Sequence, residues 1–290
     1  MNNQGRGYCF GSCGEFLQGS IDNEPILISC TIDMGSHITI TQSDQHSTPA
    51  KPLVMKAIAC TAAFFNREIN TDQLAITHHS ALPIAKGMAS STADIVAAIR
   101  ATADFLAVSI SNQETAAICA SIEPSDSVMF PSPTLMNPRT GESLDTYFTL
   151  PNCRVLILES DTQIDTSEYY RDNNHGYEDI SAALNLWRNG VKERDWYQLG
   201  KAATLSAIQN QQSNPKPLFE TVIAEVQQLN CFGICTAHSG SVIGILYDPV
   251  MTTEHDLLSR FQTPCFSNHY PSIYSATICV DDNCSLRPIE

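Results

Sequence analysis

The stretch 82-LPIAKGMASSTADIVAAIRA-101 sets small and hydroxyl residues directly in front of a segment, 93–107, that is apolar on almost every side. A helix of that composition is buried on most of its faces. N–H groups in the first helical turn have no intrahelical partner, and the helix dipole adds about half a positive charge there. Gly87 can take a conformation closed to other residues, and Ser90 or Ser91 can cap the helix. The residues alone leave two interpretations open, a phosphate-binding loop or an ordinary serine-capped helix.

Length and charge limit the functions that the chain can have. Its 290 residues suffice for one large domain or two ordinary ones. Thirty-one acidic against sixteen basic residues give a formal net charge of −15, which disfavours a nucleic-acid partner because such partners are bound through their phosphates. No apolar run reaches the ~18 residues of a membrane span, and the polar segment 1–7 is unlike a secretory signal. We therefore expect a cytoplasmic protein without nucleic-acid or membrane partners, and the sequence leaves its oligomeric state open.

Eleven cysteines are a high and odd number. They lie among apolar neighbours, and no CxxC occurs anywhere in the chain. The absence of that pair argues against a zinc site. We therefore expect reduced, buried thiols, as in a cytoplasmic protein.

Hydrophobic patterns predict a chain that mixes helices and strands. Alternation and β-branched residues indicate strands, whereas apolar residues at helical spacing indicate helices. The expected strands are residues 26–41, 74–80, 154–160 and two within 231–248, and the expected helices are residues 53–68, 93–107, 112–121, 178–190, 195–212 and 217–229. Proline and glycine predict turns over 131–142, and a seam between two halves is expected near 144–152.

Three motifs, in order, resemble those of the GHMP kinase superfamily. The opening stretch is neither a Walker A loop nor a Rossmann fingerprint, because it has no GxxxxGK[ST] and no GxGxxG. Proline, three residues, glycine, two residues and Ser-Ser-Thr before a long apolar helix instead resemble the superfamily's phosphate-binding motif. The segments 11-GSCGEFLQG-19 and 237-AHSGSVIG-244 resemble its first and third motifs. The forms SCGEFLQG, LPIAKGMASSTADI, EPSDSVMF and AHSGSVIG are most similar to its L-threonine kinase branch, of cobalamin biosynthesis.

The resemblance implies an α+β, two-domain GHMP kinase fold. ATP would lie between an N-terminal α+β half of the ribosomal-protein type, residues 1–150, and a ferredoxin-like C-terminal half, residues 151–290. The implied reaction uses ATP and Mg²⁺ to phosphorylate the side-chain hydroxyl of L-threonine, and O-phospho-L-threonine would feed the aminopropanol linker of adenosylcobalamin. Two alternatives stay open: a GHMP kinase for another small alcohol (homoserine, pantoate or a mevalonate derivative), or a catalytically inactive nucleotide-binding sensor.

The resemblance also implies roles for single residues. Ser91 and Glu123 would hold magnesium, and Asp126 would be the base or the orienting group for the acceptor hydroxyl. The surrounding Pro-Ser-Asp-Ser is also typical of a polar capped turn. Glu114 is an alternative metal ligand, and Lys86 either adds positive charge to the triphosphate or faces water. The residues expected to wrap the ATP phosphates are Pro83, Ile84, Ala85, Lys86, Gly87, Met88, Ala89, Ser90, Ser91 and Thr92.

The acceptor side would come from the first and third motifs. Glu15 and Gln18 are candidates to hold the amino group of an amino-acid substrate, although a buried, structural Glu15 fits the pattern equally. Ser12 stands roughly where mevalonate kinase has a lysine, so a lysine-assisted mechanism is not implied. A lone histidine near a turn is more often structural than catalytic, which is the role favoured for His238. Arg171 is either a partner for a carboxylate or an ordinary exposed arginine. The expected substrate-side residues are Ser12, Glu15, Gln18, His238, Ser239 and Gly240.

Overall fold

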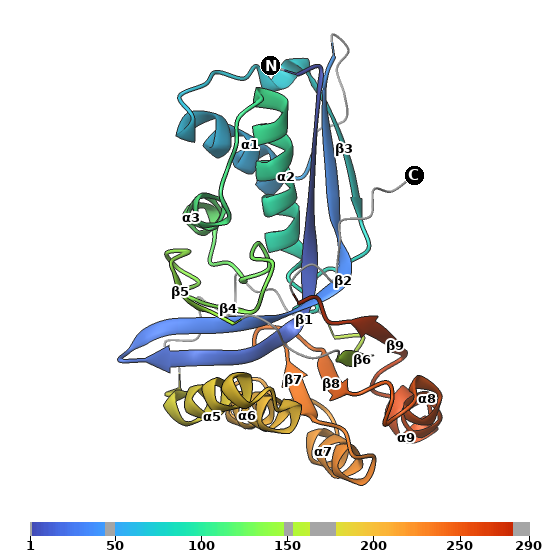
Figure 1. Ribbon diagram of the computed structural model, residues 1–290. Coiled ribbons are helices and arrows are strands. Elements are labelled where there is room, and N and C mark those ends of the chain that lie inside the picture. The colour runs from blue at the N-terminus through green and yellow to red at the C-terminus, as the bar shows by residue number, and fades with distance from the viewer. Residues whose placement is uncertain (1, 44–49, 148–152, 163–177, 281–290) are drawn as a thin grey trace.

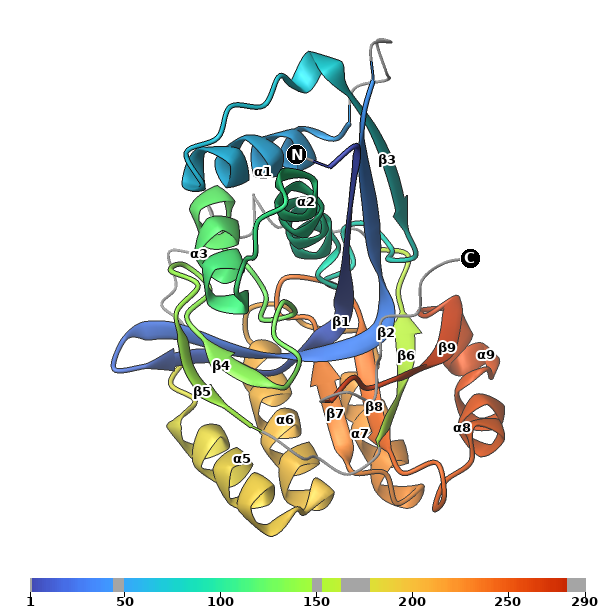
Figure 2. The same ribbon diagram turned by 45° about the horizontal axis from the view of Figure 1, so that its top comes forward.

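The computed structural model describes residues 2–43, 50–147, 153–162 and 178–280. Within them the strands form one nine-stranded sheet in the order β5-β4-β2-β1-β7-β8-β6-β9, with β3 paired to β2 outside that path (Figures 1 and 2). The strands are β1 (Gln4–Ile21), β2 (Glu24–Gln42), β3 (Leu74–Ser80), β4 (Thr134–Met136), β5 (Ser143–Thr146), β6 (Arg154–Glu159), β7 (Gly233–Thr236), β8 (Ile243–Tyr247) and β9 (Ser272–Thr277).

Two groups of helices lie along the β1–β2 hairpin, and α7 and α8 pack on β6, β7 and β8. In Figure 1, α1, α2 and α3 lie together against the upper half of the β1–β2 hairpin, and α5 and α6 lie below its lower half. The helices are α1 (Pro52–Phe64), α2 (Ser90–Leu106), α3 (Asn112–Ile122), α5 (Ser181–Glu193), α6 (Trp196–Asn210), α7 (Phe219–Gln228), α8 (Glu254–Phe261) and α9 (Pro264–Ser267), with a short 3₁₀ helix, η1 (Thr71–Gln73).

The β1–β2 hairpin is the element that both groups share. It turns at Asp22 and Asn23, whose φ values of 52° and 67° suit a tight hairpin turn. Register shifts follow Phe10 and flank Glu15, so the hairpin bends there (Figure 1). Glu15 pairs with β2 on one side and with β7 on the other. Beside it, Gly14 has φ +64°, and a Cβ on Gly14 would lie 2.3 Å from backbone of β7, so only glycine allows this junction.

Separate hydrophobic clusters fill the space under each helix group. One lies between α1–α3 and the upper hairpin, a second between the lower hairpin and α5–α6, and a third between β6–β8 and α7–α8. In the second, the rings of Phe16 and Trp187 lie 4.9 Å apart, and neither side chain is exposed. Burial of a ring like that of Phe16 stabilises the fold by about 3 kcal/mol, and it fixes the strand that carries Glu15.

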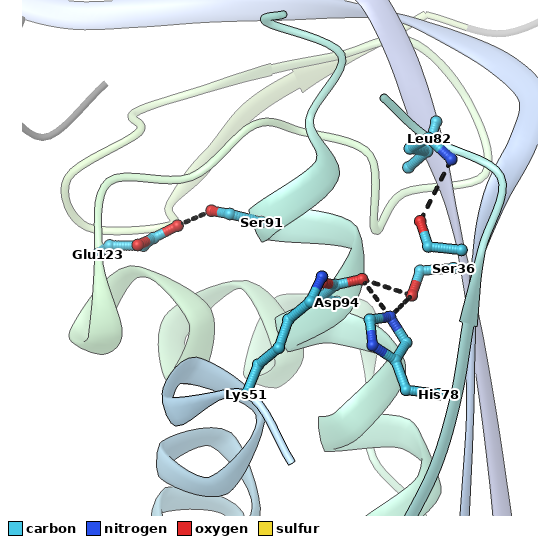
Figure 3. A network of polar contacts seen from close by, with 8 residues as sticks. Ser36, Lys51, His78, Leu82, Ser91, Asp94 and Glu123 are labelled. Carbon is cyan, nitrogen blue, oxygen red and sulfur yellow. Dashed lines mark hydrogen bonds and ion pairs between the residues drawn. The ribbon is translucent and has the colours of Figure 1, made fainter. Parts of the chain in front are cut away.

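A buried carboxylate holds α2 in place. Asp94, one turn into the helix, has one oxygen 2.6 Å from the Ser36 hydroxyl and 2.8 Å from Nε2 of His78. Its other oxygen lies 2.8 Å from Nζ of Lys51. Figure 3 shows these groups on one side of α2, with Ser91 turned to the other side. The network therefore joins α2 to β2, β3 and the start of α1, and it fixes the helix whose first turn follows the glycine loop.

Several sequence-based expectations are confirmed and others are wrong. The strand predicted at residues 74–80 is β3, and the helix predicted at 112–121 is α3. The turn region 131–142 contains a short strand, β4, because its residues pair with β2 and β5. The seam predicted near 144–152 falls partly on residues outside the described ones, so the boundary at 150 stays a prediction.

The structure tests the expectation that the cysteines are reduced and buried. Nine described cysteines are free, but Cys60 is partly exposed and Cys265 exposed, and Cys279 is disulfide-bonded. The expectation that all the thiols are reduced and buried is therefore wrong at these positions.

Among the described helices, none has both the length and the apolar character needed to cross a membrane.

Candidate active site

The loop before α2 has an unusual backbone. Ala85, Gly87 and Ala89 have φ values of 60°, 78° and 55°, so three alternate residues are left-handed. For an alanine this conformation costs about 1–2 kcal/mol, and such strain is concentrated at functional sites. The predicted special conformation of Gly87 is thus confirmed. Left-handed residues within a turn are typical of the backbone N–H concavities that bind anions.

The predicted serine cap is wrong. Helix α2 begins at Ser90, and its N-cap is Ala89, which cannot cap with a side chain. The reason is the left-handed turn at Ala89, which directs the chain into the helix without a hydroxyl acceptor. The first-turn N–H groups of α2 are therefore not covered by a side-chain cap, and they are available to an anion.

The third-motif turn packs directly on this loop. The N–H of Ser241 donates to the carbonyl of Lys86 at 2.9 Å. A Cβ on Gly240 would lie 2.2 Å from that same carbonyl oxygen and 2.4 Å from Cα of Gly87. The two turns, 155 residues or so apart in sequence, thus touch through glycines, and no side chain separates them.

Lys86 does not face water. It is 7% exposed, and its Nζ donates to the carbonyls of Ser160 at 2.5 Å and Thr162 at 3.3 Å. The solvent-facing alternative is therefore wrong. A role of Lys86 in binding phosphate stays a prediction, and it would require Nζ to leave these carbonyls at the end of β6.

Ser91 and Glu123 come together as the sequence suggested. The Ser91 hydroxyl donates to the carboxylate of Glu123, which follows the last residue of α3 (Figure 3). Burial raises the pKa of Glu123, and the hydrogen bond from Ser91 opposes that shift. A hydroxyl beside a carboxylate is a pair of hard oxygen donors, the chemistry that Mg²⁺ selects.

Glu114, the alternative metal ligand, is committed elsewhere. Its carboxylate accepts from the N–H and hydroxyl of Ser111, and Ser111 in turn caps the N–H of Glu114, which is a capping box at the start of α3. Glu123 lies at the opposite end of that helix, about 13 Å away at 1.5 Å per residue. The two carboxylates therefore cannot share one ion, and Glu114 is excluded as a ligand beside Ser91.

Asp126, three residues after Glu123, contacts Thr92, the residue that follows Ser91 on α2. The hydroxyl of Thr92 donates to Oδ2 of Asp126 at 3.0 Å. Burial raises the pKa of Asp126, and hydrogen bonds from Thr92 and Glu15 oppose the shift. Ser91 and Thr92 are adjacent in the sequence, so one turn of helix places both candidate carboxylates, Glu123 and Asp126.

Glu15 joins Asp126 to the third motif. It is 6% exposed, its side chain hydrogen-bonds to Asp126, and its Oε2 accepts the backbone N–H of His238 at 3.0 Å. Burial first, and then the charge of Asp126, raise the pKa of Glu15 well above its usual range. Two carboxyl groups in contact hold one proton between them. Sequence reasoning selected both residues but not this contact, because 111 residues separate them and no motif relates the two.

The other third-motif residues have clear places. His238 is buried, its Nε2 lies 3.4 Å from the Ser206 hydroxyl, and burial lowers its pKa to about 3, so the ring is neutral. This favours the structural role over a catalytic one. Ser239 is partly exposed on the turn beside Gly240.

The first-motif residues lie close to Glu15. Within the described part of the chain, the hydroxyls of Ser12 and of Thr236, which pairs with Glu15, are buried without a hydrogen-bond partner. Buried polar groups without partners are rare, and a water, an ion or a polar ligand can satisfy them. Gln18 is also buried, and its backbone N–H donates to the hydroxyl of Ser206 at 3.1 Å. Arg171 lies outside the described residues.

Sequence reasoning missed Lys216. Its Nζ lies 3.2 Å from Oδ1 of Asn210 and 2.9 Å from the carbonyl of Asn214, and the side chain is 6% exposed. Burial lowers its pKa to about 7, and the charge of Glu15 opposes the shift. The only local signal is its position between two prolines, which carries no chemical meaning by itself.

Comparison with known proteins assigns this geometry to a family. The model of the GHMP kinases N terminal domain matches residues 53–131. The L-threonine kinase of Citrobacter freundii is 36% identical over 83% of this chain and 85% of its own length. The L-threonine kinase of Salmonella typhimurium is 32% identical over 91% of this chain and 89% of its own.

Solved structures agree on the fold. The homoserine kinase of Cytophaga hutchinsonii superimposes with a TM-score of 0.68 at 13% identity, covering 97% of this chain and 96% of that one. At such low identity the likeness concerns the fold alone. The α+β fold expected from the sequence is thereby confirmed.

Proposed function

The chain belongs to the L-threonine kinase branch of the GHMP kinases, and on that premise we propose that it transfers the γ-phosphoryl group of ATP to the side-chain hydroxyl of L-threonine. A continuous row of polar contacts supports the proposed phosphoryl transfer. It runs from Ser91 and Glu123, through Thr92 and Asp126, to Glu15. A kinase needs charge neutralisation, a base and a rigid frame, and the row contains candidates for each.

Asp126 is the proposed base. It accepts the proton of the threonine hydroxyl as that oxygen bonds to the γ-phosphorus, while the bond from this phosphorus to the β–γ bridging oxygen breaks. The products are ADP and O-phospho-L-threonine. Thr92 donates to Oδ2 of Asp126 and so fixes the carboxylate at the start of α2, where the phosphate loop ends.

We propose that Glu15 carries the proton that it shares with Asp126. Its pKa is raised by burial and by Asp126, whereas the hydrogen bond from Glu15 lowers that of Asp126. The proton of the pair therefore belongs on Glu15, which leaves Asp126 ionised, as a base requires. The role of Glu15 or Gln18 toward the substrate amino group stays a prediction.

Mg²⁺ fits the residues present. The hydroxyl of Ser91 and the carboxylate of Glu123 already touch, and both are oxygen donors at the end of the loop. We propose that these two residues hold the ion. When bound, it would supply positive charge that neutralises the transferring phosphate. Residues 83–92 would hold the triphosphate through backbone N–H groups and the α2 dipole.

The place of the reaction in the cell is part of the same proposal. We assign the product to the aminopropanol linker of adenosylcobalamin, as the resemblance to the L-threonine kinase branch implied. We place the reaction in the cytoplasm, since the nine free cysteines among the described residues suit a reducing compartment.

The test is ADP release from Mg-ATP with a panel of acceptors: L-threonine, D-threonine, L-serine, L-homoserine, pantoate and mevalonate. The proposal predicts strong turnover with L-threonine and little with the others. Turnover with a different alcohol would keep the kinase but overturn the acceptor. ATP binding without turnover of any acceptor would favour a sensor.

A further inference from the structure

One buried cation near the site has no counter-charge. Lys216 is 6% exposed, and the oxygens that its Nζ contacts belong to a neutral amide, on Asn210, and a backbone carbonyl, of Asn214. Over residues 2–43, 50–147, 153–162 and 178–280, no carboxylate forms an ion pair with it. A buried ammonium group without an anion is costly, so the site calls for an anionic ligand.

The surroundings of Lys216 place that anion beside the base. The same amides that hold Lys216 also hold the third motif: Asn210 donates to the carbonyl of His238, and Asn214 donates to those of His238 and Gly240. Glu15 is close enough to Lys216 to interact with it electrostatically, and Glu15 hydrogen-bonds to Asp126. Lys216 and Asp126 are thus both neighbours of Glu15.

An ammonium has three N–H donors, and the two contacts of Lys216 use two of them. The third is available to an anion. Among the described residues, the hydroxyl of Thr236, which pairs with Glu15, has no hydrogen-bond partner and is a further polar group that a small polar ligand can satisfy there.

We propose that Lys216 binds the α-carboxylate of the amino-acid acceptor. The inference rests on the proposed function, since it takes L-threonine as the acceptor. Its hydroxyl lies at Asp126 while its carboxylate pairs with Lys216, so the two groups fix the acceptor at opposite ends. A charged residue of this kind makes the enzyme select a free amino acid over an alcohol without a carboxylate.

A phosphate of ATP is the other anion that this lysine could take. The neighbours of Lys216 are Asn210, Asn214, Glu15 and His238, and none belongs to the loop 83–92. The loop packs instead on Gly240 and Ser241, and within the described residues Lys216 is connected to Gly240 only through Asn214. The contacts therefore favour the acceptor carboxylate over the nucleotide.

The test compares L-threonine with L-threoninamide, which keeps the hydroxyl and the amino group but lacks the negative charge. Wild-type enzyme should prefer L-threonine in kcat/KM by about 10- to 100-fold, the usual worth of a buried hydrogen bond to a charge. Lys216→Met should lose that preference through KM for L-threonine, with kcat on L-threoninamide and affinity for ATP unchanged. Lys216→Arg should restore part of it. Lys201→Met, at an exposed lysine on α6, is the matched control and should behave as wild type.

Each other result overturns the inference. An equal loss on both acceptors would make Lys216 a residue that positions Glu15, and a loss confined to ATP affinity would assign it to the nucleotide. A lower melting temperature of Lys216→Met with the preference intact would make it structural. If wild-type enzyme turned over another alcohol but not L-threonine, the proposed function itself would fail, and this assignment with it.

Discussion

Asp126→Asn should separate catalysis from folding at the centre of the site. Asparagine has the same shape, can still accept from Thr92 and can still bond to Glu15, so the contacts that place residue 126 survive. It cannot take a proton from the acceptor hydroxyl. A positioned general base contributes about 10²- to 10⁴-fold. We therefore expect kcat to fall by that factor, which corresponds to roughly 2.7–5.5 kcal/mol of barrier.

The same substitution should not weaken the fold at neutral pH. Burial and the charge of Asp126 raise the pKa of Glu15, so the folded protein holds a proton there that the unfolded chain loses. The stability linked to that proton is complete below the pKa of an unfolded glutamate, and it is lost as pH rises through the folded value. Removing the charge of Asp126 lowers the pKa of Glu15 in the folded protein. At high pH, each pKa unit of that decrease raises the free energy of unfolding by about 1.4 kcal/mol.

The assay has three parts. Steady-state ADP release with L-threonine gives kcat, calorimetric titration gives ATP affinity, and thermal melts near pH 5 and pH 8 give the stability difference. Asp72→Asn, at an exposed aspartate of η1, is the matched control. Near-wild-type kcat in Asp126→Asn would refute the assignment of the base. If Asp126→Asn were less stable than wild type near pH 8, the claim that Glu15 and Asp126 share a proton would be refuted.

Three further substitutions test the frame around the base. Asp94→Asn should lower the free energy of unfolding by about 2 kcal/mol, because Ser36 and His78 lose a charged acceptor, while the half-exposed Lys51 adds little; an unchanged urea midpoint would contradict this. Glu123→Gln should raise the Mg²⁺ concentration for half-maximal activity at least about tenfold, with ATP saturating; an unchanged metal titration would remove Glu123 from the ion site. Gly240→Ala should raise KM for ATP and cost about 1–3 kcal/mol of stability, because its Cβ meets the Lys86 carbonyl; wild-type values for both would show that the two turns do not pack together.

The sequence was enough to predict the helices and strands whose position depends on a single local pattern. Alternation placed β3 at residues 74–80, and the proline at 124 ended α3 close to where it was expected. Strand β1 was not predicted, because its many glycines weaken the strand pattern, and long-range pairing with β2 decides its conformation. The start of α2 was misplaced for a similar reason, since tertiary contacts impose the left-handed turn at Ala89.

For the site, too, local motifs predicted some residues, whereas others depend on long-range contacts. The residue types in the motifs identified Ser91, Glu123 and Asp126, and helix spacing brings their partners together. The contact of Glu15 with Asp126 depends on a bulge in a bent hairpin, which no local pattern specifies. Lys216 belongs to no motif, and only the burial of its side chain beside Glu15 reveals it.

The most direct test of the central claim is the identity of the product. Wild-type enzyme is incubated with Mg-ATP and L-threonine, and the product is examined by ³¹P NMR and mass spectrometry against authentic O-phospho-L-threonine. We predict one new phosphomonoester that matches the standard and forms in equal amount with ADP. ADP formed without phosphothreonine, or at the same rate when L-threonine is omitted, would contradict the account.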